Sequence, residues 1–107
     1  MLSADPPPPV TVRVLSSTSS SITIAWESNN DERTPVGGYV ISVKSEASDW
    51  AEHNIAGYHS TYVVDNLSCG TRYYIYVCPF NKAGRAQASS PLHASTTGTG
   101  NGYYYIL

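Results

Sequence analysis

The chain has few charged residues for its size. Lys, Arg, Asp and Glu make up 13% of its 107 residues, against roughly 25% in ordinary soluble proteins. Six basic and eight acidic side chains give a formal net charge of −2, and no block of like charge occurs along the sequence. Because a surface without a basic cluster does not attract nucleic acid or anionic lipid, neither is expected as a partner.

Long apolar runs are also absent. The apolar stretches extend over only a few residues, whereas a membrane-spanning helix needs about 20. The start, Leu2–Asp5, has neither the basic end nor the apolar core of a secretory signal. We expect a piece of a longer chain. It divides into a proline-rich linker over 1–9, one domain over 10–97 and a flexible tail or cloning remnant over 98–107.

Only two cysteines, Cys69 and Cys78, are present, and a disulfide between them is not expected. If residues 71–78 form one strand, they extend over about 25 Å at ~3.3 Å per residue, whereas bridged Cα atoms lie within about 7 Å of each other. We therefore predict two free thiols. Cys69 is expected in a turn, and Cys78 on the exposed face of a sheet, where it could cross-link two molecules.

The residue patterns of catalytic and metal sites are missing. The three histidines, His53, His59 and His93, have no spacing that would bring together the three or four ligands of a metal site. No serine stands in a nucleophile-elbow motif, and no glycine-rich phosphate loop occurs. We expect no enzymatic activity, no cofactor or metal ion and no small-molecule substrate.

What the sequence does contain is a series of short β-prone segments. Apolar and polar side chains alternate in them, so that Val10, Val12 and Val14 share one face of the first. Turn signals recur about every 8–12 residues, and no amphipathic helix is present. This pattern predicts an all-β, seven-stranded, antiparallel immunoglobulin-like Greek-key β-sandwich. The expected strands are 10–14, 21–26, 39–43, 50–55, 60–64, 72–80 and 92–96.

The run LSCGTRYYIYVCPFNKAG, residues 67–84, is the strongest of these segments. Alternation places Tyr73, Val77 and Pro79 on the core face of one strand. Gly70 permits a tight turn just before it, which places the Tyr73 ring inside the sandwich with its hydroxyl free to bond to upstream backbone. This arrangement is the tyrosine corner of Greek-key sandwiches. Because Pro79 has no N–H, strand pairing is predicted to be disturbed there.

A spaced set of these residues resembles the fibronectin type III domain over about residues 6–97. The resemblance implies that the first, second and fifth expected strands form one sheet and the others form the second. It also implies which side chains define the fold. Cys78 and Pro79 depart from the family's common pattern. The residues that carry the resemblance are Trp26, Gly38, Tyr39, Leu67, Gly70, Thr71, Tyr73, Val77, Asn81 and Gly84; those expected to be structural are Trp26, Tyr39, Leu67, Gly70, Tyr73 and Val77.

Within this family, Leu67–Tyr73 and Tyr76–Gly84 are most similar to modules of Dscam-type (Down syndrome cell adhesion molecule) neuronal receptors. The resemblance implies an extracellular module of a single-pass membrane protein at the cell surface. Its partners would be neighbouring immunoglobulin and fibronectin domains, and another copy of itself. Self-recognition in such receptors belongs mostly to their immunoglobulin domains, so a stalk function remains open.

Two other interpretations remain. An intracellular fibronectin-type module of a muscle scaffold would suit two unpaired thiols, because disulfides are rare in reducing compartments. An accessory domain of a carbohydrate-active enzyme is the other, but no flanking catalytic sequence supports it.

Tyr74, Tyr76, Lys82 and Arg85 are the candidate interface residues. The two tyrosines are expected on the outer face of the larger sheet, either as an adhesive patch, because tyrosine is favoured at interfaces, or as cross-strand pairs that stabilise the sheet. Lys82 and Arg85 lie in an expected turn, and the loop over 29–33 is also charged and exposed in this interpretation.

Asn66 begins the sequence Asn66-Leu67-Ser68, which matches the acceptor pattern for N-glycosylation. Short patterns of this kind also occur by chance. The pattern falls in the expected turn before the longest strand, where Asn66 would face outward while Leu67 faces the core. Asn66 is therefore a glycosylation candidate.

Overall fold

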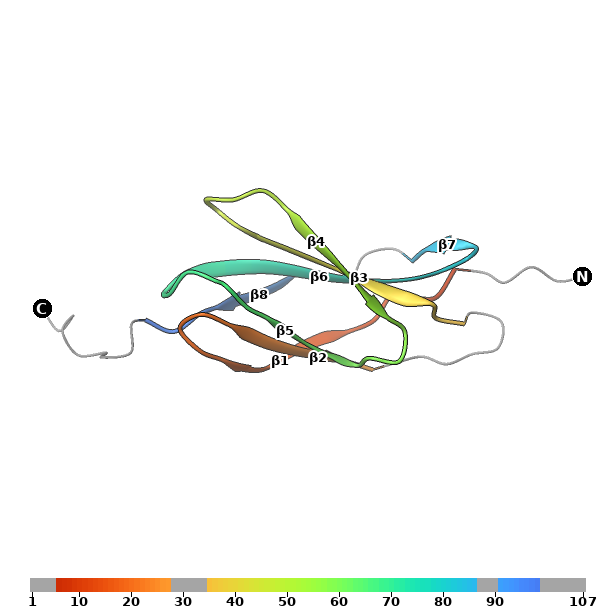
Figure 1. Cartoon of the computed structure of the whole chain (residues 1–107), viewed down its shortest axis with the longest axis horizontal. Helices are drawn as coiled ribbons and strands as arrows, with labels where there is room; N and C mark the ends of the chain where they lie inside the picture. The colour runs from red at the N-terminus through yellow and green to blue at the C-terminus, as the bar shows by residue number, and fades with distance from the viewer. Residues whose placement is uncertain (1–5, 28–34, 87–90, 99–107) are drawn as a thin grey trace, which may run out of the picture.

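A computed structural model describes residues 6–27, 35–86 and 91–98 of the chain. All regular elements in these ranges are strands, and they lie in two layers (Figure 1). No helix among the described residues is long and apolar enough to span a membrane. The strands are β1 (Val12–Ser17), β2 (Ile22–Trp26), β3 (Gly38–Ser45), β4 (Ala51–Ala56), β5 (Thr61–Val64), β6 (Arg72–Asn81), β7 (Gly84–Arg85) and β8 (Leu92–Ser95).

The two layers are antiparallel sheets. One has the order β1-β2-β5, and the other has the order β4-β3-β6, with β7 and β8 both pairing with β6. This arrangement confirms the all-β sandwich and the division of strands that the family resemblance implies. One element was not expected: the two-residue β7 pairs Gly84 and Arg85 with Asn81 and Phe80, so the predicted turn is a tight hairpin.

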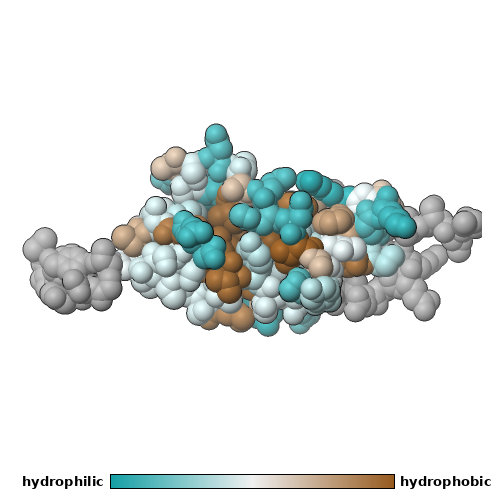
Figure 2. Space-filling model, viewed as in Figure 1, coloured by the Kyte–Doolittle hydropathy of each residue, from teal (hydrophilic) through white to brown (hydrophobic). Residues whose placement is uncertain are grey.

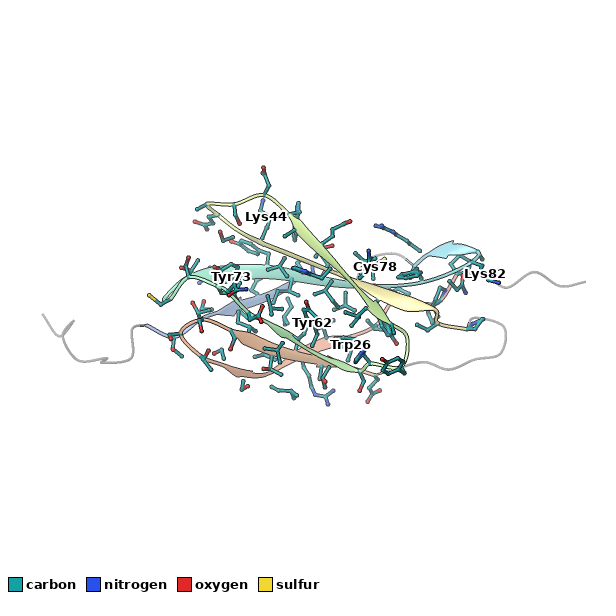
Figure 3. The ribbon with its side chains drawn as sticks, viewed as in Figure 1. Trp26, Lys44, Tyr62, Tyr73, Cys78 and Lys82 are labelled. Carbon is teal, nitrogen blue, oxygen red and sulfur yellow. The ribbon has the colours of Figure 1, made fainter. Side chains whose placement is uncertain are left out.

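Side chains from both sheets fill the space between the layers, and Figure 3 shows Trp26 and Tyr62 within it. The Trp26 and Tyr39 rings are tilted against each other, with centroids 5.0 Å apart. Burial of each large apolar side chain contributes roughly 1.5–3 kcal/mol, so this cluster supplies most of the driving force for folding. The buried cluster comprises Val10, Ile22, Ile24, Trp26, Tyr39, Ile41, Val43, Val64, Tyr73, Ile75 and Val77, and Leu67 packs against it partly buried.

The N-terminal segment departs from the predicted alternation. Val10 is buried but precedes the strand, which begins at Val12. A register shift between Val14 and Ser16 marks a bulge, and a bulge changes the face to which the following side chains point. Val14 pairs with the buried Ile24 and so lies on the core face, as predicted, but on the edge strand β1 its side chain remains 38% exposed. Within the proline run, Pro7 is buried.

The turn between β5 and β6 has the geometry of a tyrosine corner. The Tyr73 ring is 7% exposed, and its hydroxyl oxygen accepts a hydrogen bond of 2.8 Å from the Ser68 N–H. Gly70 adopts φ +57°, a left-handed conformation that glycine takes without steric cost. Its N–H donates to the Thr97 carbonyl over 2.7 Å, which ties the turn to the end of the domain.

Pro79 does not disturb the pairing of β6 with β3, so the prediction of a disturbance is wrong on that side. The register runs without a shift from Ser45 with Tyr73 to Gly38 with Phe80. The Pro79 carbonyl accepts a hydrogen bond of 2.8 Å from the Ala86 N–H. Because the N–H and C=O of one strand residue point to the same side, the donor that proline lacks faces away from β3.

Candidate interaction surface

The outer face of the larger sheet carries a cluster of aromatic side chains. Since β6 turns Tyr73, Ile75 and Val77 inward, Tyr74 and Tyr76 point to the opposite face. Tyr76 pairs with Ser42 of β3, and Tyr74 pairs with Lys44 and, on its other side, with His93 of β8. We call the surface formed by Lys44, Glu46, Trp50, Tyr74, Tyr76, Pro91 and His93 the aromatic surface.

The rings of the aromatic surface contact one another in pairs. Trp50 and Tyr76 have centroids 4.9 Å apart, and Tyr74 meets His93 edge to face at 4.8 Å. The Lys44 Nζ lies 5.5 Å from the centre of the Trp50 ring, within the range of a cation–π contact. These contacts hold the rings in place before any partner arrives, which reduces the entropy lost on binding.

The same residues line a shallow groove of about 460 Å³. Trp50 is 44% exposed, and the Tyr74 hydroxyl donates a 3.3 Å hydrogen bond to Glu46 Oε1. The two tyrosines were predicted from the sequence, but Trp50 and Glu46 were not, because the β3–β4 hairpin has little periodic pattern. The one available signal was an isolated tryptophan in an otherwise polar stretch.

Lys82 and Arg85 lie outside the aromatic surface. Figure 3 shows Tyr73 and Lys82 at opposite ends of β6, and Lys82 is exposed in the turn before β7. Arg85 lies 3.7 Å from Glu52 of β4, and both side chains are more than half exposed. Such a pair contributes little to stability. The structure therefore places the four candidate interface residues in two separate groups.

Cys78 is buried, so the prediction of an exposed thiol is wrong. The side chain is on the outer face, as alternation requires, but only 8% of it is exposed. Its Sγ lies 3.0 Å from the Ala86 carbonyl oxygen, because the chain leaving β7 passes beside it. Burial raises the pKa of the Cys78 thiol, Arg85 offsets part of this rise and Glu52 adds to it. Cys69 is exposed, and both thiols are free.

The two thiols are expected to react at different rates with a thiol reagent such as DTNB. Because the thiolate is the reactive form, the raised pKa and burial of Cys78 both slow its reaction. We expect Cys69 to react at once in the native protein and Cys78 to react only as the protein unfolds. Absorbance of the released thiolate in buffer and in urea measures this. Two equally fast equivalents in buffer would contradict the burial of Cys78.

No group of three or more histidine, cysteine or acidic side chains that could hold a metal lies within 6–27, 35–86 and 91–98. Asn66 is exposed at the β5–β6 turn. The predicted loop over 29–33 lies outside the described residues. In the view of Figure 2, polar side chains cover most of the surface, with apolar ones exposed between them. In these ranges the aromatic surface is therefore the candidate for recognition.

A two-layer sandwich with this strand order and a tyrosine corner defines the immunoglobulin-like class of β module. The sequence pattern of the fibronectin type III domain matches residues 5–95, so the chain belongs to the fibronectin type III family.

Two relatives and one solved structure show this similarity in more detail. The chain is 30% identical over 98 residues to cell adhesion molecule Dscam2 of Drosophila melanogaster. The aligned region covers 92% of this chain and 5% of the relative. It is 33% identical over 92 residues to receptor-type tyrosine-protein phosphatase F of Danio rerio, covering 85% and 5%. The crystal structure of chicken CNTN1 FN1–FN3 domains superposes with a TM-score of 0.76 at 26% identity, covering 86% of this chain and 33% of that one.

The chain thus spans about one twentieth of the length of the curated relatives that it matches. One relative is named as a phosphatase, and that activity is not assigned to this chain. What the comparisons establish is a fibronectin type III domain similar to domains of cell adhesion molecules.

Proposed function

We propose that the chain is an extracellular fibronectin type III module of a Dscam-like adhesion receptor, where it spaces neighbouring domains and presents a surface for protein binding. The observation that carries the spacer role is the position of its two ends. The first described residues, before β1, and the last, after β8, lie at opposite ends of the sandwich in Figure 1. A domain attached on each side is therefore held one sandwich length from the other.

The aromatic surface supports the binding role, and a second copy of the chain is the partner that its charges fit. Within the aromatic surface, Lys44 and Glu46 supply one charge of each sign. In a two-fold dimer the same patch meets itself, so a face with equal numbers of both charges can pair opposite signs. Exposed tryptophan and tyrosine are the residues that most often carry binding energy at interfaces.

Sedimentation of the chain with Cys69→Ser tests this pairing, because that substitution removes the exposed thiol as a cause of dimers. We expect a concentration-dependent dimer that Trp50→Ala or Tyr76→Ala weakens at least tenfold, or about 1.4 kcal/mol. Val63→Ser is the matched control, since Val63 is 52% exposed but lies on the other sheet. A chain that stays monomeric, or a control that weakens the dimer equally, would leave only the spacer role.

The intracellular scaffold interpretation is less well supported. That interpretation was based on the two unpaired thiols. One of them, Cys78, is buried in the structure, and because a buried thiol reacts slowly, it does not require a reducing compartment. The relatives are named as a cell adhesion molecule and a receptor-type phosphatase, which favours the cell surface as the location of this module.

A further inference from the structure

Asn66 occupies a position that leaves its side chain open to modification. It is exposed in the turn after β5 and has φ +57°, a conformation in which asparagine is one of the few tolerated residues. That conformation explains an asparagine or glycine at this position. It does not explain the hydroxyl two residues later, at Ser68, which completes the glycosylation acceptor pattern.

The backbone around Asn66 is anchored independently of its side chain. The Leu67 N–H donates to the Ser20 carbonyl over 2.9 Å, and the Ser68 N–H donates to the Tyr73 hydroxyl. The Ser68 carbonyl accepts a 2.6 Å hydrogen bond from Thr96 Oγ1. Because these bonds use backbone atoms of residues 67 and 68, a group attached to Asn66 Nδ2 disturbs none of them.

A groove of about 420 Å³ begins at Asn66 and lies between the β5–β6 turn and the β3–β4 hairpin. Apolar side chains of Val64 and Tyr73 line it, and Ser48 and Asp49 of the hairpin supply polar groups. A pyranose ring has apolar C–H faces and polar hydroxyl edges. The mixed lining of this groove, which includes the acceptor residue, therefore matches the first sugar of an attached chain.

We propose that Asn66 is N-glycosylated and that the first sugar of the glycan lies in this groove. The proposal rests on the extracellular function proposed above, since the donor is a lipid-diphosphate-linked oligosaccharide of the secretory pathway. In the transfer, Asn66 Nδ2 forms a bond to C1 of the donor sugar and loses one proton to the host transferase. The bond from C1 to the diphosphate oxygen breaks, and the lipid diphosphate leaves with its electron pair.

Secretion from eukaryotic cells with an added signal peptide and an added C-terminal acceptor sequence tests the modification. A lectin collects the glycosylated protein, and peptide mapping reports the occupancy of the added sequence, which shows that the chain has met the transferase whatever its native location. We expect intact mass to show two glycans on the parent chain and one on Ser68→Ala and on Asn66→Gly. Glycine keeps the left-handed backbone at position 66, so Asn66→Gly serves as the folding control. A parent with a glycan at the added sequence and none at Asn66 would overturn the proposal without bearing on the adhesive role.

The thermal midpoint of unfolding tests the placement of the sugar. We expect the glycosylated parent to unfold about 4 °C or more above Ser68→Ala, the shift that ~1 kcal/mol produces in a domain of this size. The same two chains made in bacteria carry no glycan and give the effect of the substitution itself. Trimming to one sugar should keep the gain. Equal midpoints for the two secreted proteins would contradict a sugar that contacts the groove.

Discussion

Replacing Trp26 with alanine is expected to lower the free energy of unfolding by about 3–5 kcal/mol, the usual cost of deleting a large buried aromatic side chain. Trp26 is 2% exposed and is the largest of the fully buried side chains in the described residues. It packs against Tyr39 of the opposite sheet at 5.0 Å. Because small domains have only about 5–15 kcal/mol of stability, this one change should remove a large share of the stability of the domain.

Two further variants separate the reasons for this loss. The Trp26 Nε1 is buried and has no hydrogen-bond partner among residues 6–27, 35–86 and 91–98, so Trp26→Phe removes that donor while it keeps a ring against Tyr39. We expect Trp26→Phe to lose no more than about 2 kcal/mol, since an unpaired buried donor itself costs roughly 1–3 kcal/mol. Trp50→Ala is the surface control, with an expected loss below ~1.5 kcal/mol for one aromatic pair. Urea unfolding followed by far-UV circular dichroism measures all three. A Trp26→Ala loss no greater than that of Trp50→Ala would contradict the core assignment.

Tyr73→Phe is expected to lower the free energy of unfolding by about 1–3 kcal/mol, because the Ser68 N–H loses the acceptor of a partly buried hydrogen bond. The substitution removes one oxygen atom and leaves the buried ring in place. Tyr76→Phe is the matched control: it removes the same atom from the same strand on the outer face, and surface changes of this kind stay within about 0.5 kcal/mol. The same urea unfolding measures both, and equal stability of the two variants would contradict a structural role for the Tyr73 hydroxyl.

The fold could be predicted because it depends on local pattern. Alternation of side chains fixes which face of a strand is buried, and it assigned the core face of β2, β3 and β6. The turn at Gly70 and the placement of Tyr73 also follow from nearby residues. The bulge in β1 could not be predicted in this way, because it depends on how Val14 and Ser16 pair with β2.

The errors concern contacts between residues far apart in the sequence. Cys78 was assigned to the outer face correctly, but its cover comes from Ala86, eight residues later and beyond a hairpin. Trp50 joins Tyr76 only because the β3–β4 hairpin folds over the outer face. Neither contact has a periodic signal, so the candidate surface was found only in part.

The account depends most on Tyr73 as an internal acceptor that fixes the turn before β6. Hydrogen exchange at the Ser68 amide measures this bond directly. Ser68 is in an exposed turn, yet its N–H donates to the Tyr73 hydroxyl over 2.8 Å. The account predicts that this amide exchanges slowly in the native protein and that Tyr73→Phe removes the protection while the β6 amides keep theirs. A Ser68 amide that exchanges at the rate of an unstructured peptide in the native protein would contradict it.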